Sequence, residues 1–217
     1  DVCSSDLRNS ARALSELPTW IREDLDEQDI PLPVGVSDSL DLLERNAKRM
    51  DQMLVDLLTY ARSGQRGNPA PVGLAPFLED IEACLCLPVS VTLSVKTVEG
   101  TVQMAKEDAK MLIKVLIDNA VVHGAHPKGR IELSAWVSEG IVHLVVEDDG
   151  PGIAPDQMDK AFMPMRKGQR RDDVEGSGMG LAIAKKIVAS ANGTLFAGQS
   201  ANLGGLRIEM RFPGVVG

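Results

Sequence analysis

Two glycine-rich stretches in the C-terminal half of the sequence constrain the fold more than any other feature. The first reads VVEDDGPGI (145–153), an apolar run that ends in acidic residues and turns at two glycines. The second reads GSGMG (176–180) and opens the apolar helical run LAIAKKIVASA. Glycines let a turn lie close to a flat ligand, and at a helix N-terminus they leave N–H groups that suit phosphate. In this order they predict a site for a flat ring at one end and phosphates at the other.

Asp148, at the end of the predicted strand, is suited to reading the flat ring. A carboxylate at this place can accept a hydrogen bond from an exocyclic amine. A single glycine-rich loop would indicate only a turn and a helix start. Two such loops with an acidic strand end, and a matching helix upstream (LIDNAVVHG, 116–124), make a nucleotide site the stronger interpretation.

Together these motifs resemble the ATP-binding domain of sensor histidine kinases. The matching segments are LIDNAVVHG (116–124), DDGPGI (148–153), the lid segment AFMPMRKG (161–168) and GSGMGL (176–181). The wider family includes gyrase, mismatch-repair ATPases and the ninety-kilodalton heat-shock protein. The resemblance covers nearly the whole chain and implies a protein that binds ATP together with Mg²⁺.

The resemblance also assigns roles to individual residues. It implies that Asn119 holds Mg²⁺, through an amide oxygen that suits a hard cation, and that Asp148 reads adenine. Phe162 and Met165 match the apolar part of the lid, and Lys167 follows where a cation could meet the γ-phosphate. The residues expected at the ATP site are Asn119, His123, Asp148, Gly150, Gly152, Ile153, Lys167, Gly176, Ser177, Gly178, Met179, Gly180 and Leu181.

Three polar residues near these motifs are expected to take no part in the chemistry. Asp149, beside the adenine reader, is predicted to be solvated. His126 and His143 have no partner signal, and we interpret them as structural or surface residues.

The N-terminal segment SSDLRNS (4–10) resembles the phosphoacceptor motif S-H-D-L-R-N-P of histidine kinases. Ser5 stands where the family has its histidine, and Asp6 matches the acid that can take the imidazole proton. Imidazole is a good neutral nucleophile, whereas a serine hydroxyl is a poor one unless a base activates it. Ser10 replaces the usual proline, so we expect a straighter helix there.

Two valines depart from the family pattern near the phosphates. Val115 replaces an asparagine that many members have one turn before the metal-binding one, and Val122 replaces a lysine three residues after it. These changes, with Ser5 and Ser10, predict weakened or absent autophosphorylation. The leading hypothesis is a two-component sensor kinase core that passes phosphoryl groups to a response-regulator receiver domain. The alternative is a degenerate pseudokinase, a dimeric scaffold that docks a protein partner.

Heptad spacing predicts a helical hairpin at the N-terminus. Residues 3–24 read as one helix, 25–36 as a loop, and a second helix is capped by Ser37 or Asp38 and continues to Ala61. Such a hairpin cannot bury both faces alone, so we expect a homodimeric four-helix bundle. Packing of the hairpin on its own C-terminal domain is the alternative. The hairpin also disfavours the third hypothesis, a different ATPase or a serine kinase of the superfamily.

The rest of the sequence alternates strand and helix signals. Helices are predicted over residues 76–85, 108–122 and 178–191, and a hairpin turn at 138–140. We expect an α+β protein, with an α/β sandwich of one mixed sheet covered by helices on one face. The predicted divisions are the helical hairpin (1–64), a linker (65–71) and the ATP-binding domain (72–217).

Composition bounds the remaining possibilities. A net charge of -8 argues against nucleic acid as a partner, and no apolar run approaches a membrane span. Three cysteines without metal-ligand spacing fit reduced thiols, so we expect a cytoplasmic protein with no membrane contact in this segment. Because the phosphoacceptor-like motif begins so near the first residue, we expect a fragment whose input part lies upstream.

Overall fold

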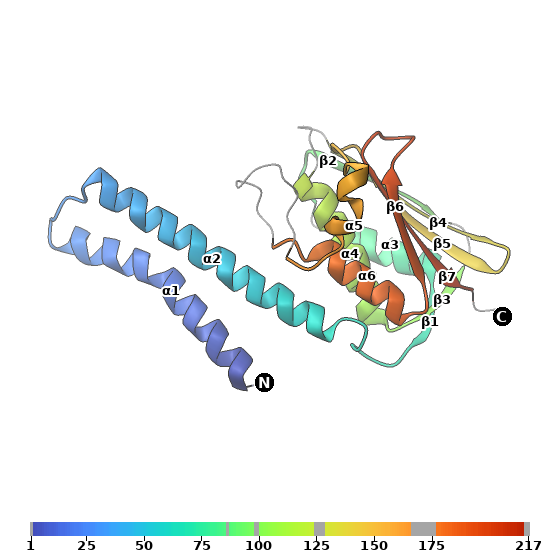
Figure 1. Ribbon diagram of the computed structural model, residues 1–217, viewed down its shortest axis with the longest axis horizontal. Helices are drawn as coiled ribbons and strands as arrows, with labels where there is room; N and C mark the ends of the chain where they lie inside the picture. The colour runs from blue at the N-terminus through green and yellow to red at the C-terminus, as the bar shows by residue number, and fades with distance from the viewer. Residues whose placement is uncertain (1, 86, 98–99, 124–128, 166–176, 215–217) are drawn as a thin grey trace. The chain divides into compact units, whose positions relative to one another are not determined.

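The structure is a computed structural model that describes residues 2–85, 87–97, 100–123, 129–165 and 177–214, with side chains from Ala13 onward. Residue contacts divide the described chain into two compact units. The first holds the N-terminal hairpin up to Leu58, with Ser177 grouped in it, and the second begins at Thr59 and holds the strands and remaining helices. Figure 1 follows the chain through both units, and each is described here by itself.

The first unit is a pair of helices, α1 (Val2–Glu27) and α2 (Val34–Arg62). Both predicted helices are confirmed, and Pro18 lies inside α1. The loop expected over residues 25–36 is shorter than predicted, and the proposed cap at Ser37 or Asp38 is wrong. The carbonyl of Pro33 accepts hydrogen bonds from Val36 N (2.9 Å) and Ser37 N (3.1 Å), so the helix closes its first turn on the proline.

The two helices of the hairpin bury only part of their apolar surface. Leu40 and Ala47, from the predicted seam of α2, are buried, and Arg22 of α1 bonds to Ser37 Oγ (3.2 Å) and Asp41 (2.5 Å). Within the single chain, a set of apolar side chains on both helices stays exposed: Leu14, Leu17, Trp20, Ile21, Leu42, Leu43, Met50, Val55 and Leu57.

In the second unit, five strands of the described chain form one mixed sheet in the order β2-β4-β5-β7-β6. Only β2 and β4 run parallel; the other pairs are antiparallel. The hairpin predicted at 138–140 is confirmed, because Glu139 and Gly140 both have positive φ between β4 and β5. The strands are β2 (Val91–Thr97), β4 (Gly129–Ser138), β5 (Ile141–Asp148), β6 (Thr194–Gln199) and β7 (Leu206–Pro213).

The expectation that all strands belong to one sheet is wrong. Strands β1 (Ala70–Gly73) and β3 (Thr101–Met104) pair with each other in a separate antiparallel ribbon. The buried side chains of this ribbon, Val72, Val102 and Met104, belong to the main hydrophobic core. The short strands therefore serve as a cover for the core rather than as an extension of the sheet.

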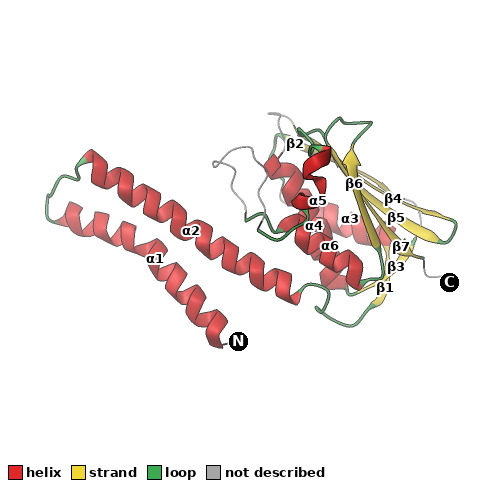
Figure 2. Ribbon diagram, in the orientation of Figure 1, coloured by secondary structure: helices red, strands yellow, loops and turns green. Residues whose placement is uncertain are grey.

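Helices cover one face of the sheet, as predicted (Figure 2). Their aliphatic faces pack against alternate side chains of the strands, so the core forms although aromatic residues make up only 3% of the sequence. Residues Ile113, Leu116, Ile183 and Ile187 are nearly inaccessible to solvent. The helices are α3 (Leu74–Cys84), α4 (Lys106–His123) and α6 (Gly180–Ser190), with the short turns η1 (Pro155–Gln157) and α5 (Met158–Ala161) before α6.

The chain enters the second unit through a densely hydrogen-bonded segment. The side chain of Asp108, buried at the start of α4, accepts hydrogen bonds from the backbone N–H groups of Gly64 (3.2 Å) and Arg66 (3.4 Å). Lys186 Nζ donates to the carbonyls of Tyr60 (2.6 Å) and Ala61 (2.9 Å). Lys186 therefore satisfies carbonyls that the end of helix α2 leaves without helical partners, and Asp108 fixes the backbone that follows the helix.

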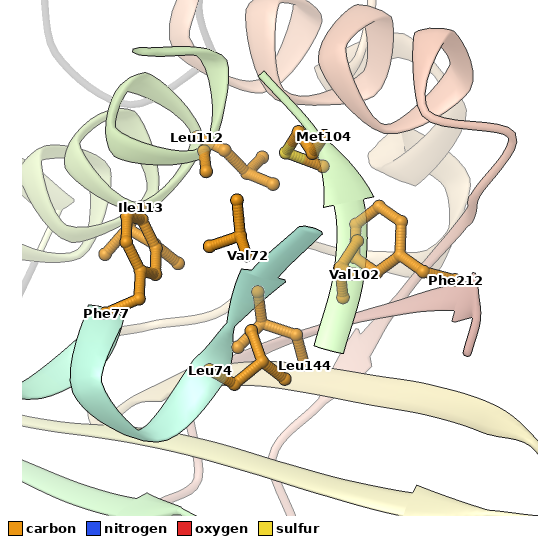
Figure 3. Close-up of a pocket in the computed structure, with 10 residues that line it drawn as sticks. Val72, Leu74, Phe77, Val102, Met104, Leu112, Ile113, Leu144 and Phe212 are labelled. Carbon is orange, nitrogen blue, oxygen red and sulfur yellow. The ribbon is translucent and has the colours of Figure 1, made fainter. Parts of the chain in front are cut away.

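A small apolar cavity of about 20 Å³ lies inside the second unit, between the β1–β3 ribbon, two helices and the sheet (Figure 3). Its size is close to that of one water molecule, but among the described residues no polar side chain faces it. It is therefore a packing defect of the core rather than a nucleotide site. The lining residues are Val72, Leu74, Phe77, Val102, Met104, Ala109, Leu112, Ile113, Leu144 and Phe212.

Candidate nucleotide site

Asp148 closes strand β5 with its carboxylate held by the backbone. Its Oδ1 accepts hydrogen bonds from Gly150 N (2.9 Å) and from Leu206 N (3.0 Å). The residue is 8% exposed. Both bonds go to the same oxygen, Oδ1, and within the described part of the chain no hydrogen bond to Oδ2 is found. A carboxylate fixed in this way can accept a hydrogen bond from an amine at a defined direction.

The electrostatics of Asp148 reflect its burial. Desolvation raises the pKa of the carboxyl above its usual 3.8, and the two backbone hydrogen bonds and the nearby His123 oppose this rise. His123 ends helix α4 and is itself exposed. The structure thus brings these two predicted site residues within electrostatic reach of each other.

Asp149 corrects one prediction. It was expected in solvent, but it is 9% exposed, and its Oδ1 accepts a hydrogen bond from Arg130 N (3.0 Å). Its other oxygen faces Arg130 Nε at 3.4 Å. The two adjacent acids therefore have different tasks: Asp149 fixes the start of strand β4 while Asp148 faces the turn.

The glycine turn after β5 lies against the loop that precedes β7. Gly152 has φ +67°, a conformation that favours glycine. A Cβ at this position would lie 3.5 Å from the carbonyl oxygen of Gly205. Ile153 follows the turn and is half-buried against the core. Gly150 contributes the N–H that meets Asp148.

Gly205 and Leu206 are site residues that the sequence reasoning missed. The Gly205 N–H donates to the Asp148 carbonyl (3.1 Å), and the Leu206 N–H donates to the Asp148 side chain. The glycine pair 204–205 between two strand patterns was a signal for a tight turn. Nothing local in the sequence, however, indicates which residue that turn contacts.

Asn119, the predicted metal ligand, is half-buried on helix α4. Val115, one turn earlier, is also half-buried, whereas Val122 is 44% exposed. Helix α6 begins against this part of α4, since a Cβ on Gly180 would lie 3.7 Å from the Val115 carbonyl oxygen. The helix that carries Asn119 and the glycine-rich helix start therefore lie side by side.

The second glycine stretch leads into α6 as predicted. Gly178 has φ +73°, and Met179 is the residue that precedes the first helical turn. Met179 and Leu181 are buried, and Ser177 is buried too. The Met179 sulfur accepts a hydrogen bond from Met165 N (3.3 Å), which joins the lid segment to this turn.

Some predicted site residues lie wholly or partly outside the described part of the chain. Lys167 and Gly176 lie outside the described residues. Ser5 and Asp6 lie in helix α1, where the backbone but not the side chains is described. His126 is also outside the described part, whereas His143 bonds to Glu209 (3.0 Å) and stacks on Trp136 on the sheet, in agreement with a structural role.

No group of three or more His, Cys, Asp or Glu side chains in the described part is placed to hold a metal ion. Among the described helices, none has the length and apolar character needed to cross a membrane.

Comparison with known proteins identifies the family and the fold of the chain. Residues 104–215 match the family model "Histidine kinase-, DNA gyrase B-, and HSP90-like ATPase". A curated relative is the sensor protein RstB of Escherichia coli (strain K12), which is 33% identical over 182 residues. The alignment covers 79% of this chain and 40% of RstB. The chain thus spans about two fifths of the length of that relative.

Solved structures share the fold. The Acinetobacter baumannii histidine kinase AdeS is 18% identical, with a TM-score of 0.63 over 93% of this chain and 95% of its own. Full-length ShkA, solved in complex with AMPPNP, is 19% identical, with a TM-score of 0.66 over 100% of this chain and 45% of its own. The chain belongs to the family of histidine kinase-, DNA gyrase B- and HSP90-like ATPases and, within it, to the sensor histidine kinases.

Proposed function

We propose that the second unit binds Mg-ATP and that Asp148 recognises the adenine amine. The single observation that supports this most is the carboxylate held by two backbone N–H groups on one oxygen, at the end of a central strand. The other oxygen would accept a hydrogen bond from the amine. The glycine turn at 150–152 would let the adenine ring approach the backbone.

The phosphate end of the proposed site is the start of helix α6. Helix α6 is eleven residues long and begins at Gly180. The first N–H groups of the helix and the positive end of its dipole suit phosphate oxygens. Gly176, Ser177, Gly178, Met179 and Leu181 belong to this end by sequence, and Lys167 would contribute a cation. The structure of ShkA was solved with AMPPNP, an ATP analogue, and this is in keeping with the proposed role.

Asn119 is the proposed Mg²⁺ ligand. Mg²⁺ bound to nucleotide keeps several waters and takes few protein ligands, so one amide oxygen on α4 fits the site without a cluster of acids. When bound, the ion would neutralise the phosphates. His123, one turn further along α4, would lie near the nucleotide.

We further propose that residues 1–64 form a dimerisation and phosphoacceptor-like hairpin, joined through a linker (65–71) to an ATP-binding domain (72–217). The exposed apolar residues of α1 and α2, such as Leu17 at 40% and Met50 at 41% exposure, support pairing with a second copy. Burial of this strip in a four-helix bundle would remove it from water.

The proposed partner of the dimer is a response-regulator receiver domain. A phosphoryl group would pass from ATP to a side chain at position 5 and then to the regulator. Ser5 is a poor acceptor, so a pseudokinase that docks a partner without autophosphorylation is the second candidate. Ser5, Val115 and Val122 all favour the second candidate.

Calorimetric titration of Mg-ATP and ADP into the chain, with the Ser5→His variant in parallel, tests these proposals. Binding of ATP, with an acid-labile phosphate on the histidine variant, would support intact catalytic machinery that lacks only its acceptor. Binding without modification would favour the pseudokinase. Absence of nucleotide binding would contradict the proposed ATP site.

A further inference from the structure

The loop that joins β6 to β7 is closed by its own hydrogen bonds. Ser200 N donates to the carbonyl of Gly205 (2.8 Å), and Gly204 N donates to the carbonyl of Ser200 (3.0 Å). The Ser200 hydroxyl accepts a hydrogen bond from Leu203 N (2.9 Å). Residues 200–205 thus form one compact turn organised around a single serine.

Glu147 of strand β5 holds this turn from one side. The Ser200 hydroxyl donates to Glu147 Oε1 (2.8 Å), while Asn202 Nδ2 (3.5 Å) and Arg207 (3.4 Å) face Oε2. Ser200 is 2% exposed and Glu147 is 3% exposed. A carboxylate buried this deeply is costly unless partners surround it, and here the loop provides them.

Asp148 holds the same turn from the other side. Successive side chains of a strand point to opposite faces, so Glu147 and Asp148 reach the loop along different faces of β5. The backbone N–H groups of Gly205 and Leu206 bind the Asp148 carbonyl and side chain. Glu147 and Asp148, adjacent on strand β5, therefore bind the two ends of the loop between β6 and β7.

The hydrogen bonds of Glu147 and Asp148 to this loop together determine the orientation of the Asp148 carboxylate, the proposed adenine-binding group. One of the two N–H groups that fix Asp148 Oδ1 belongs to Leu206, at the end of the loop. If the loop moves, that donor moves, and the direction of the remaining oxygen changes with it. An amine would then meet the carboxylate at a poorer angle, and hydrogen bonds weaken steeply with misalignment.

We propose that Ser200 and Glu147 are positioning residues for the purine-reading carboxylate. In this proposal the pair does not contact the nucleotide. It fixes the position of the Leu206 N–H, and thereby the orientation of the Asp148 carboxylate. That orientation determines the selectivity for a purine with an amine over a purine with a carbonyl at the same ring position. This inference rests on the proposed ATP site. It adds that residues outside the nucleotide contacts influence which purine the site selects.

The test is the ratio of ATP to inosine triphosphate affinity, measured by calorimetry. Inosine triphosphate has the same phosphates but lacks the amine, so the ratio isolates the Asp148 contact. Ser200→Ala should lower the ratio by about tenfold, the size expected for loss of one well-directed hydrogen bond. Ser200→Thr, which keeps the hydroxyl, should restore most of the ratio.

Ser190→Ala is the matched control. Its hydroxyl donates to the Ile187 carbonyl (2.7 Å) near the end of helix α6, and the variant should leave the ratio unchanged. A Ser200→Ala protein that loses affinity for both nucleotides in the same proportion would overturn the positioning role. If Ser200→Ala does not fold, Asn202→Ala, at an exposed position, should lower the ratio by about twofold; an unchanged ratio would overturn the proposal.

The unmodified chain separates this proposal from the proposed function. If it binds ATP no better than inosine triphosphate, then Asp148 is not an amine reader and both proposals fail. If it selects ATP and the Ser200 variant selects it equally well, only the positioning role fails.

Discussion

Gly205 lies so close to Asp148 that no side chain fits between them. A Cβ on residue 205 would stand 2.3 Å from Asp148 Oδ1, 2.4 Å from the Asp148 carbonyl oxygen and 2.5 Å from Gly150 N. All three atoms take part in the geometry of the candidate site. Only glycine at residue 205 therefore allows the Asp148 carboxylate to hold its observed position.

Gly205→Ala should destabilise the fold and weaken nucleotide binding together. The new methyl group meets backbone atoms that cannot rotate away, and overpacking of this kind costs about 1–3 kcal/mol. Thermal unfolding checks the prediction. Gly198→Ala is the control, because a Cβ at residue 198 has no atom within 4 Å. Equal losses of stability in both variants would contradict this account.

Asp148→Asn should weaken ATP binding without lowering stability. Because burial raises the pKa of this carboxyl, the ionised form opposes folding: the favourable contribution present below pH 3.8 is lost as the pH rises through the raised pKa. The asparagine oxygen can still accept the two backbone hydrogen bonds, but its amide would face the adenine amine donor to donor. We expect at least about tenfold weaker binding by calorimetry, with an unchanged or higher melting temperature. Unchanged affinity would contradict the amine-reading role.

Asp108→Ala should destabilise the second unit by about 1–3 kcal/mol, since two backbone N–H groups lose a buried acceptor. Denaturant unfolding of the variant measures this change. Asp118→Ala on the same helix is the control, because the Asp118 side chain is 53% exposed and pairs with Lys114 at the surface. That surface pair is worth a few tenths of a kcal/mol. A loss at residue 108 no larger than at residue 118 would contradict the role of Asp108 as an anchor.

Glu209 should make stability depend on pH in the acid range. Burial acts to raise the pKa of Glu209, but hydrogen bonds from Arg211, His143 and Arg207 outweigh it and lower the pKa from 4.5 to about 2. A lowered pKa adds stability above the unfolded value, and this is lost as the pH falls from about 4.5 towards 2. Glu209→Gln should flatten that part of the curve, by roughly 1 kcal/mol once solvent screening is allowed for.

Denaturant unfolding at several pH values between 2 and 7 measures the effect of Glu209→Gln. Glu132→Gln is a suitable control, since Glu132 pairs with the exposed Lys96 (2.8 Å). Parallel curves for the Glu209 variant and the unmodified chain would contradict the predicted contribution.

Val102→Ile should stabilise the second unit. Val102 lines the apolar cavity shown in Figure 3, and an added methylene there gains about 0.8 kcal/mol if it fits without strain. Isoleucine also suits a strand. A higher melting temperature with unchanged ATP affinity is the expected result. A lower melting temperature would show that the cavity cannot accept the group.

The regular parts of this fold could be predicted because their signals are local. The heptad spacing of α2 and the turn between β4 and β5 were both read correctly from neighbouring residues. The start of α2 was missed because Pro33, not a side-chain cap, closes the first turn. Local preferences thus indicate that a helix exists more reliably than where it begins.

The candidate site was only partly predictable because its support comes from distant residues. Asp148 could be identified from the strand and turn around it. The burial of Asp149 depends on Arg130, and the role of Gly205 depends on its contact with Asp148, far along the sequence. Such contacts follow from the strand order of the sheet, which periodicity does not specify.

Strand β5 lies between β4 and β7, in the middle of the sheet. Backbone amides of a strand paired on both sides exchange with solvent only when much of the domain opens. The carboxylate proposed to read the base therefore sits on the part of the domain that opens last. In hydrogen-exchange experiments, the base end of the site should behave as part of the slowest-exchanging core, with or without nucleotide.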